Sequence, residues 1–233
     1  MAKRILALTL ALMLALAALT ALAEANGTIN IDKAHFPDEK FRALVKLNDF
    51  NRDGKLSDTE RKLVVNLSVP GMGITSLKGI EYFPNLLNLY ASNNKLRSLD
   101  LSKNTHLIGL TVDNNRLTSL NPGKSKQLMI LIASGNRLSQ INLTRNKGIL
   151  AVCLEDNRLR SVKLGALPKL SFLRVSGNKL KTLDIKSCPK LRAYLSSAPT
   201  EKDGVLTWGA QRGLVIDATT KLTSGTRVLY PVK

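Results

Sequence analysis

A short acidic stretch, residues 49–60 with the sequence DFNRDGKLSDTE, carries the residue types that could hold a metal ion. Oxygen-bearing side chains recur along it and end in a glutamate, and oxygen ligands are what a hard cation such as Ca²⁺ needs. Lys55 contributes only its main-chain carbonyl, and Gly54 permits a sharp turn between the ligands. The candidate ligands are Asp49, Asn51, Asp53, Lys55, Ser57 and Glu60.

The spacing of these residues resembles the calcium-binding loop of EF-hand proteins, which it matches at every ligand position. The resemblance implies one bound Ca²⁺ ion. Three of the ligands carry formal charge and the sequence offers no second loop to pair with this one. We therefore expect a structural site of weak affinity, with a dissociation constant on the order of 10⁻⁵–10⁻³ M. The alternative is an acidic helix–turn–helix that binds no metal.

Two short helices are expected to position this loop. The first begins near Pro37 and Asp38, because proline suits the first helical turn and an acid suits the positive end of the helix dipole. The second covers residues 60–67 and directs Val64 and Val65 back toward the first. Together they would close one end of the structure that follows.

An internal repeat begins at residue 86 and runs for five consecutive rows of 21 residues. A fixed period of this size predicts a solenoid, in which each coil buries its apolar side against its neighbours. An amide side chain at the inward turn can satisfy main-chain groups of its own coil and of the next. This column of asparagines consists of Asn94, Asn115, Asn136, Asn157 and Asn178.

The repeated pattern L-x-x-L-x-L-x-x-N-x-L resembles the leucine-rich repeat family in a short bacterial form, and it covers about half of the chain. Pro122 replaces one apolar position. The order of leader, acidic loop and repeats is similar to secreted or surface leucine-rich repeat proteins of bacteria, including the internalin-like group. The resemblance implies a β-rich, right-handed α+β solenoid with a strand-lined concave face, and a role in binding rather than catalysis.

Four segments follow from these patterns: a signal peptide (1–23), a helical N-terminal cap with the EF-hand-like loop (24–72), the leucine-rich repeats (73–196) and a β-hairpin C-terminal cap (197–233). The leader has a basic start, an apolar run and a small-x-small cleavage site. The alternative for it is a membrane anchor. After cleavage we expect a secreted or cell-surface protein without a transmembrane segment, since no later apolar stretch is long enough.

Positive charge dominates the composition, with 35 Lys and Arg against 17 Asp and Glu and a formal net charge of +18. Such a charge favours anionic partners. The residue after each column asparagine is basic, and coils about 5 Å apart would align these side chains in a ladder. This basic ladder consists of Lys95, Arg116, Arg137, Arg158 and Lys179.

Two interpretations of the basic ladder stay open. It is either a solvated face partly paired with nearby acids, or a stripe that binds an anionic polymer such as a glycan, lipid head groups or nucleic acid. Aromatic side chains do not interleave with it, which disfavours stacking on nucleic-acid bases.

The concave face is the second candidate surface. Several outward strand positions carry apolar side chains where solvated strands would be polar, and exposed apolar patches often mark interaction sites. The alternative is a shallow patch left by drifting repeats. The candidate partner-binding residues are Tyr90, Ile130, Ile132, Cys153, Phe172 and Arg174.

Catalysis is not expected, because His35 and His106 fall far from each other and from any nucleophile context. Cys153 and Cys188 occupy different points around the coil, so no disulfide between them is expected. The sequence therefore predicts a non-catalytic module that binds a protein ligand through its concave face. Binding of an anionic polymer through the basic ladder is the alternative, and a structural part in a larger surface assembly is a third possibility.

Overall fold

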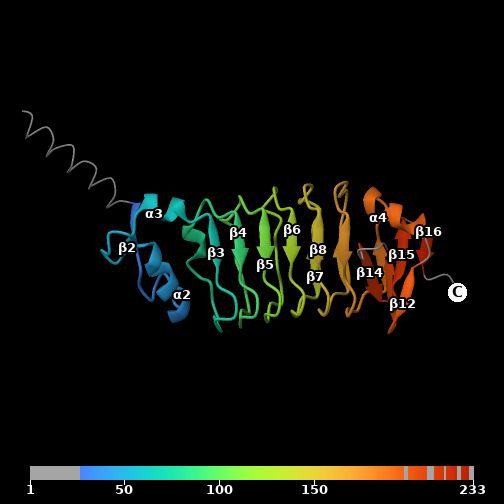
Figure 1. The fold of residues 1–233 in the computed structure, drawn as a ribbon, viewed down its shortest axis with the longest axis horizontal. Coiled ribbons are helices and arrows are strands. Elements are labelled where there is room, and N and C mark those ends of the chain that lie inside the picture. The colour runs from blue at the N-terminus through green and yellow to red at the C-terminus, as the bar shows by residue number, and fades with distance from the viewer. Residues whose placement is uncertain (1–26, 197–198, 209–212, 218, 225–226, 231–233) are drawn as a thin grey trace, which may run out of the picture.

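The computed structural model describes residues 27–196, 199–208, 213–217, 219–224 and 227–230, which form an elongated solenoid (Figure 1). The expected signal peptide, residues 1–23, lies outside this part of the chain. Within the described residues, no helix is both long enough and apolar enough to cross a membrane.

The main sheet has nine strands in the order β12-β13-β14-β10-β8-β6-β5-β4-β3. Its first six strands along the chain are β3 (Asn66–Ser68), β4 (Asn88–Tyr90), β5 (Gly109–Thr111), β6 (Ile130–Ile132), β8 (Ala151–Cys153) and β10 (Phe172–Arg174). They pair in parallel, one strand for each coil. The register aligns the fully buried side chains Leu89, Leu110, Leu131, Val152 and Leu173.

The opposite side of the coils also carries strands: β7 (Gln140–Asn142), β9 (Ser161–Lys163), β11 (Thr182–Asp184), β15 (Lys221–Ser224) and β16 (Arg227–Tyr230). β7 pairs in parallel with β9, and β11 pairs in parallel with β15. Ile141, Leu183 and Leu222 point inward from this side and are buried. Both sides of a coil thus feed one aliphatic core, and each fully buried Leu or Ile stabilises the stack by roughly 1.5–3 kcal/mol.

The column asparagines close the turn that follows each strand of the main sheet. Asn115 Nδ2 donates to the main-chain oxygens of Ala91 and Val112 at 2.8 and 3.0 Å, and its Oδ1 accepts the Leu96 N–H at 3.0 Å. The other four asparagines of this column repeat these bonds. The expectation that each amide serves the next coil is wrong. Each amide instead forms hydrogen bonds with main-chain groups of its own coil and of the preceding coil. The N–H of the preceding coil would otherwise be buried without a partner.

The residue before each column asparagine has a left-handed backbone. Asn93, Asn114 and Asp156 have φ values of 58°, 52° and 53°, and Gly135 and Gly177 have 64° and 68°. Asn, Asp and Gly are the residues that tolerate this conformation. The turn therefore depends on two adjacent columns of residues, and the repeat pattern that predicts the fold contains only the second, the asparagines.

The N-terminal elements are β1 (Ile29–Asn30), α2 (Glu39–Val45), η1 (Lys46–Asn48), β2 (Lys55–Leu56) and α3 (Asp58–Leu63), and β1 pairs antiparallel with β2. The helix expected over residues 60–67 is wrong at its end, because α3 stops at Leu63 and β3 begins three residues later. Val64 is buried but Val65 is 38% exposed. The main-chain oxygen of Val65 accepts N–H groups from the next coil, so pairing with β4 overrides the helix. The parallel sheet thus begins inside the segment assigned to the N-terminal cap.

Asp38 joins these helices to the solenoid. Its carboxylate caps α2 by accepting the Phe41 N–H at 3.1 Å, and it also accepts the N–H and hydroxyl of Thr75 at 2.8 Å each. The Phe36 and Phe41 rings pack edge to face, with 5.9 Å between their centroids. The aromatic core of the N-terminal segment is continuous with the aliphatic core of the coils, which include η2 (Ile80–Tyr82).

The C-terminal segment contains α4 (Pro189–Ala193), η3 (Tyr194–Ser196), β12 (Thr200–Lys202), β13 (Val205–Trp208) and β14 (Leu214–Asp217). β12 pairs antiparallel with β13, and β13 pairs antiparallel with β14. Residues 197–233 were expected to leave the period, but β14 lies parallel to β10 and β15 lies parallel to β11. A further coil therefore resumes after an inserted segment.

This last coil has no column asparagine. Asp217 accepts the N–H groups of Gly177 and Asn178 at 2.8 and 3.2 Å, and the Thr220 hydroxyl donates to Leu180 O at 3.1 Å. Asp217 and Thr220 thus satisfy main-chain groups of the preceding coil in place of an asparagine. The last coil therefore lacks the repeated sequence pattern by which the other coils were recognised.

Candidate binding surfaces

The outward face of the main sheet, which we call the sheet face, brings the predicted partner-binding residues together. The register places Tyr90, Ile132, Cys153 and Arg174 in one column, together with Thr111. Ile130 and Phe172 lie in the neighbouring column. Tyr90 and Ile130 are each 44% exposed, and the other predicted residues of these columns are half-buried.

A further apolar column, at the start of the main-sheet strands, was missed by the sequence analysis. Coil-to-coil hydrogen bonds align the residues directly before four successive strands: Leu87, Ile108, Met129 and Leu150. All four are partly accessible, and Met129 is 39% exposed. The signal was present in the sequence, since four apolar residues recur at one position of the repeat. With Tyr90, Ile130, Ile132 and Phe172 they form what we call the apolar patch.

Arg174 is not a free cation at the edge of this patch. Its Nη2 lies 2.6 Å from Glu155 Oε1, and the Glu155 side chain is more than four-fifths buried. Arg174 therefore neutralises a nearly buried carboxylate on the sheet face. Contact with a partner through Arg174 has to compete with this ion pair.

Cys153 is a half-buried thiol next to the same ion pair. Burial raises its pKa, the negative charges of Glu155 and Asp113 raise it further, and the Arg174 guanidinium lowers it. The thiol is therefore protonated at neutral pH and acts as an apolar group in the patch. Cys153 and Cys188 are both free, as predicted, and Cys188 is fully buried.

The basic ladder lies beside the sheet, at the turn that follows each strand. All five side chains are exposed. Their main-chain N–H groups bond to the preceding coil, as Arg116 N does to Leu96 O at 2.8 Å, so the side chains are spaced by one coil. Within the described residues no ladder side chain forms an ion pair. One interpretation of the ladder included pairing with Asp113, Glu155 and Asp156, and no such ion pair is present there. Asp113 instead accepts the Ser92 hydroxyl at 2.6 Å, and Glu155 holds Arg174.

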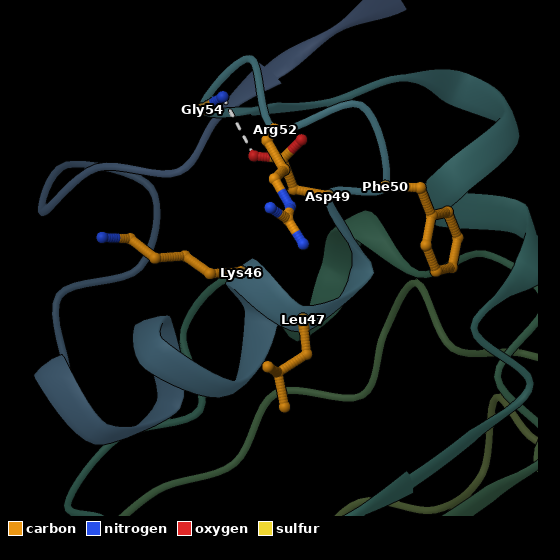
Figure 2. Close-up of a pocket in the computed structure, with 6 residues that line it drawn as sticks. All are labelled: Lys46, Leu47, Asp49, Phe50, Arg52 and Gly54. Atoms are coloured by element: carbon orange, nitrogen blue, oxygen red, sulfur yellow. Dashed lines mark hydrogen bonds between the residues drawn. The ribbon is translucent and has the colours of Figure 1, made fainter.

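The acidic loop is closed by its own hydrogen bonds (Figure 2). Asp49 Oδ2 accepts the Gly54 N–H at 2.9 Å, and Asp49 Oδ1 accepts the Asp53 N–H at 3.1 Å. Asn51 Oδ1 accepts the same Asp53 N–H at 3.1 Å. Gly54 has a φ of +77°, which permits the sharp turn. Asp49 and Asn51 thus both accept the Asp53 N–H, so their side-chain oxygens lie close together in the loop.

Glu60 takes a different position from these three residues. Its Oε1 accepts the Phe50 N–H at 2.7 Å and its Oε2 accepts the Ser57 N–H at 2.8 Å, forming a capping box at the start of α3. Burial raises the pKa of Glu60, but the bonds from Ser57, Phe50 and Asn51 outweigh it and hold the pKa below its usual value. Among the residues that the structure describes, no group of three or more His, Cys, Asp or Glu side chains is arranged to hold a metal ion. The six predicted ligands share one loop, and calcium binding stays a prediction.

A hollow beside this loop is lined by Lys46, Leu47, Asp49, Phe50, Arg52 and Gly54 (Figure 2). Leu47 is 73% exposed and Phe50 is 64% exposed. Neither of the two histidines lines this hollow: His35 Nδ1 lies 2.8 Å from Asp32 Oδ1, and His106 Nδ1 lies 3.1 Å from Pro84 O.

No family model matches the sequence, and no curated protein matches it. Two similar solved structures are internalins of Listeria monocytogenes. An internalin (inlF) is 21% identical with a TM-score of 0.56, over 68% of this chain and 48% of its own, so this chain spans about half its length. Internalin C2 (inlC2) is also 21% identical with a TM-score of 0.56, over 70% of this chain and 85% of its own. The described part of this chain thus has the leucine-rich repeat solenoid fold.

Proposed function

We propose that the protein is a secreted or cell-surface, non-catalytic module that binds a protein ligand through its sheet face. The observation that carries this proposal is the apolar patch, whose columns cross successive coils and leave Tyr90, Met129 and Ile130 more than a third exposed. Accessible apolar side chains of this extent on a rigid sheet are typical of protein interfaces. The likeness to the internalin fold supports a binding module, since such solenoids typically bind rather than catalyse.

The patch and the ion pair have different roles in this proposal. Tyr90, Ile130 and Phe172 serve as anchors that lose water on binding. The Glu155–Arg174 pair, with 2.6 Å between its charged atoms, borders the anchors. A partner group that pairs with Glu155 or Arg174 breaks the contact between them and leaves the other residue without its counter-charge. This favours partners that supply a polar group for each of the two residues.

A displayed library of random peptides, selected on the full chain, tests the role of the patch. Selected peptides should be rich in aromatic and aliphatic residues and should lose binding to the variant Ile132→Asp/Phe172→Asp. The matched control is Gln140→Asp/Thr182→Asp, which adds the same charge at exposed strand positions on the opposite side of the coils. Peptides that bind all three proteins equally would show that the patch is not the site.

We further propose that the acidic loop holds one weakly bound, structural Ca²⁺ ion. Asp49, Asn51 and Asp53 would supply side-chain oxygens, two of which already accept one N–H of the loop, and the remaining ligands are the Lys55 carbonyl, Ser57 and Glu60. An ion bound there would cross-link the loop to the start of α3. Glu60 has to exchange its bonds to Phe50 and Ser57 for the ion, which supports weak affinity.

The second candidate function is binding of an anionic polymer through the basic ladder. Its five exposed side chains have no ion-pair partner among the described residues, which supports an external counter-charge.

A further inference from the structure

The basic ladder has a repeat distance fixed by the fold. Each of its residues is hydrogen-bonded through the main chain to the preceding coil, with N···O distances between 2.8 and 2.9 Å along the whole ladder. The coils carry adjacent parallel strands, so the rise from one ladder position to the next is about 4.8 Å. The ladder is thus a row of positive charges with one charge for each coil.

These charges repel one another, and no described contact offsets the repulsion. Of the three candidate acids, Asp113 and Glu155 are held by Ser92 and Arg174, and Asp156 forms no ion pair with the ladder among the described residues. Like charges at this spacing raise the free energy of the isolated protein, most strongly at low salt. A bound polymer with negative groups at the same spacing removes the repulsion and adds an attraction at every coil.

The C-terminal end of the ladder widens into a site with two rows of cations. A hollow there is lined by Arg160, Lys179 and Lys181. In the next coil, the exposed Lys221 donates its main-chain N–H to Lys181 O at 2.9 Å, which continues the second row. Several cations around one hollow can surround an oxyanion from more than one side, and the arginine supplies a planar donor fork.

We infer that the ladder binds an extended anionic polysaccharide with one acidic group for each sugar. The polymer lies along the solenoid axis, across the coils, and one acidic group occupies the hollow. Nucleic acid fits less well because no aromatic side chain interleaves with the ladder. A lipid surface fits less well because the ladder is a single row except at its C-terminal end. The inference depends on the second candidate function and is independent of the sheet face.

Titration of the full chain with polygalacturonate, a linear polymer with one carboxylate for each sugar, tests the inference. The ladder variant is Arg116→Ser/Arg137→Ser/Arg158→Ser. The matched control is Lys103→Ser/Lys124→Ser/Arg145→Ser, three exposed cations from another column of successive coils, with the same change in net charge. We expect the ladder variant to bind about tenfold more weakly and the control to change by less than about twofold. Wild-type binding should weaken steeply between low and physiological salt.

Three results would overturn the inference. Equal loss in the two variants would mean that polygalacturonate responds only to net charge. Tighter binding of a single-stranded oligonucleotide with the same number of charges would reassign the ladder to nucleic acid. Absence of polygalacturonate binding by the wild type at low salt would remove the site itself. The variant Ile132→Asp/Phe172→Asp should bind the polymer like the wild type, which separates this test from the test of the sheet face.

Discussion

Asn136 Oδ1 accepts the main-chain N–H of Leu117 at 2.9 Å, across the boundary between two coils. The Nδ2 of the same side chain donates to Val112 O at 3.0 Å and to Ala133 O at 3.1 Å. One buried amide thus satisfies three main-chain groups that are shielded from water. The solenoid is held together by this relationship, repeated at each column asparagine, as well as by its leucines.

The variant Asn136→Leu should lower the free energy of unfolding by about 2–4 kcal/mol, because the main-chain groups left buried lose their partners. Urea denaturation followed by circular dichroism measures the change. The control is Gln127→Leu, which replaces an exposed amide and should change stability by less than about 0.5 kcal/mol. Similar values for the two variants would mean that the column amides are not structural.

The variant Gly135→Ala should lower the free energy of unfolding by about 1–2 kcal/mol. Gly135 has a φ of +64°, and an added Cβ would lie 2.4 Å from Asn114 Oδ1. Gly148→Ala is the control, because its Cβ would meet only Leu128 O, at 3.8 Å, and its φ is not left-handed. Thermal unfolding of both variants measures the effect. Gly135→Ala should melt at a lower temperature than Gly148→Ala, because only the first places a side chain at a left-handed position. Equal melting temperatures would contradict the prediction.

Stability should depend on the ionisation of Asp38. Burial raises the pKa of Asp38, but hydrogen bonds from Thr75, Phe41 and Ser76 outweigh burial and hold it below its usual value. A carboxyl group whose pKa is lower in the folded state stabilises the protein above its unfolded pKa of about 3.9, and this contribution is lost as the pH falls through the folded value.

The variant Asp38→Asn should therefore be less stable than the wild type by about 1 kcal/mol at pH 7, and the difference should shrink as the pH falls below about 4. Denaturation at several pH values measures it. Glu39→Gln, at the adjacent exposed position, should show no such trend. A difference for Asp38→Asn that stays constant down to pH 2.5 would exclude the charge as its cause.

Calcium should raise the melting temperature. With a dissociation constant of about 1 mM, 10 mM Ca²⁺ stabilises the folded state by about 1.4 kcal/mol, or about 3–6 °C for a chain of this size. The variant Asp49→Asn should lose the shift, whereas Glu39→Gln should keep it. A wild-type melting temperature that does not respond to millimolar Ca²⁺ would remove the proposed ion.

The sequence by itself determined the solenoid, because a fixed period of 21 residues lets only one stacking bury every apolar column. It also placed Tyr90, Ile132 and Cys153 in one outward column, since side chains alternate along a strand. Only the tertiary structure showed that Arg174 is paired with Glu155, that Val65 is exposed and that β14 rejoins the sheet beside β10. Each of these depends on a partner from another coil, and a contact between residues far apart in the chain leaves no periodic signal in the sequence.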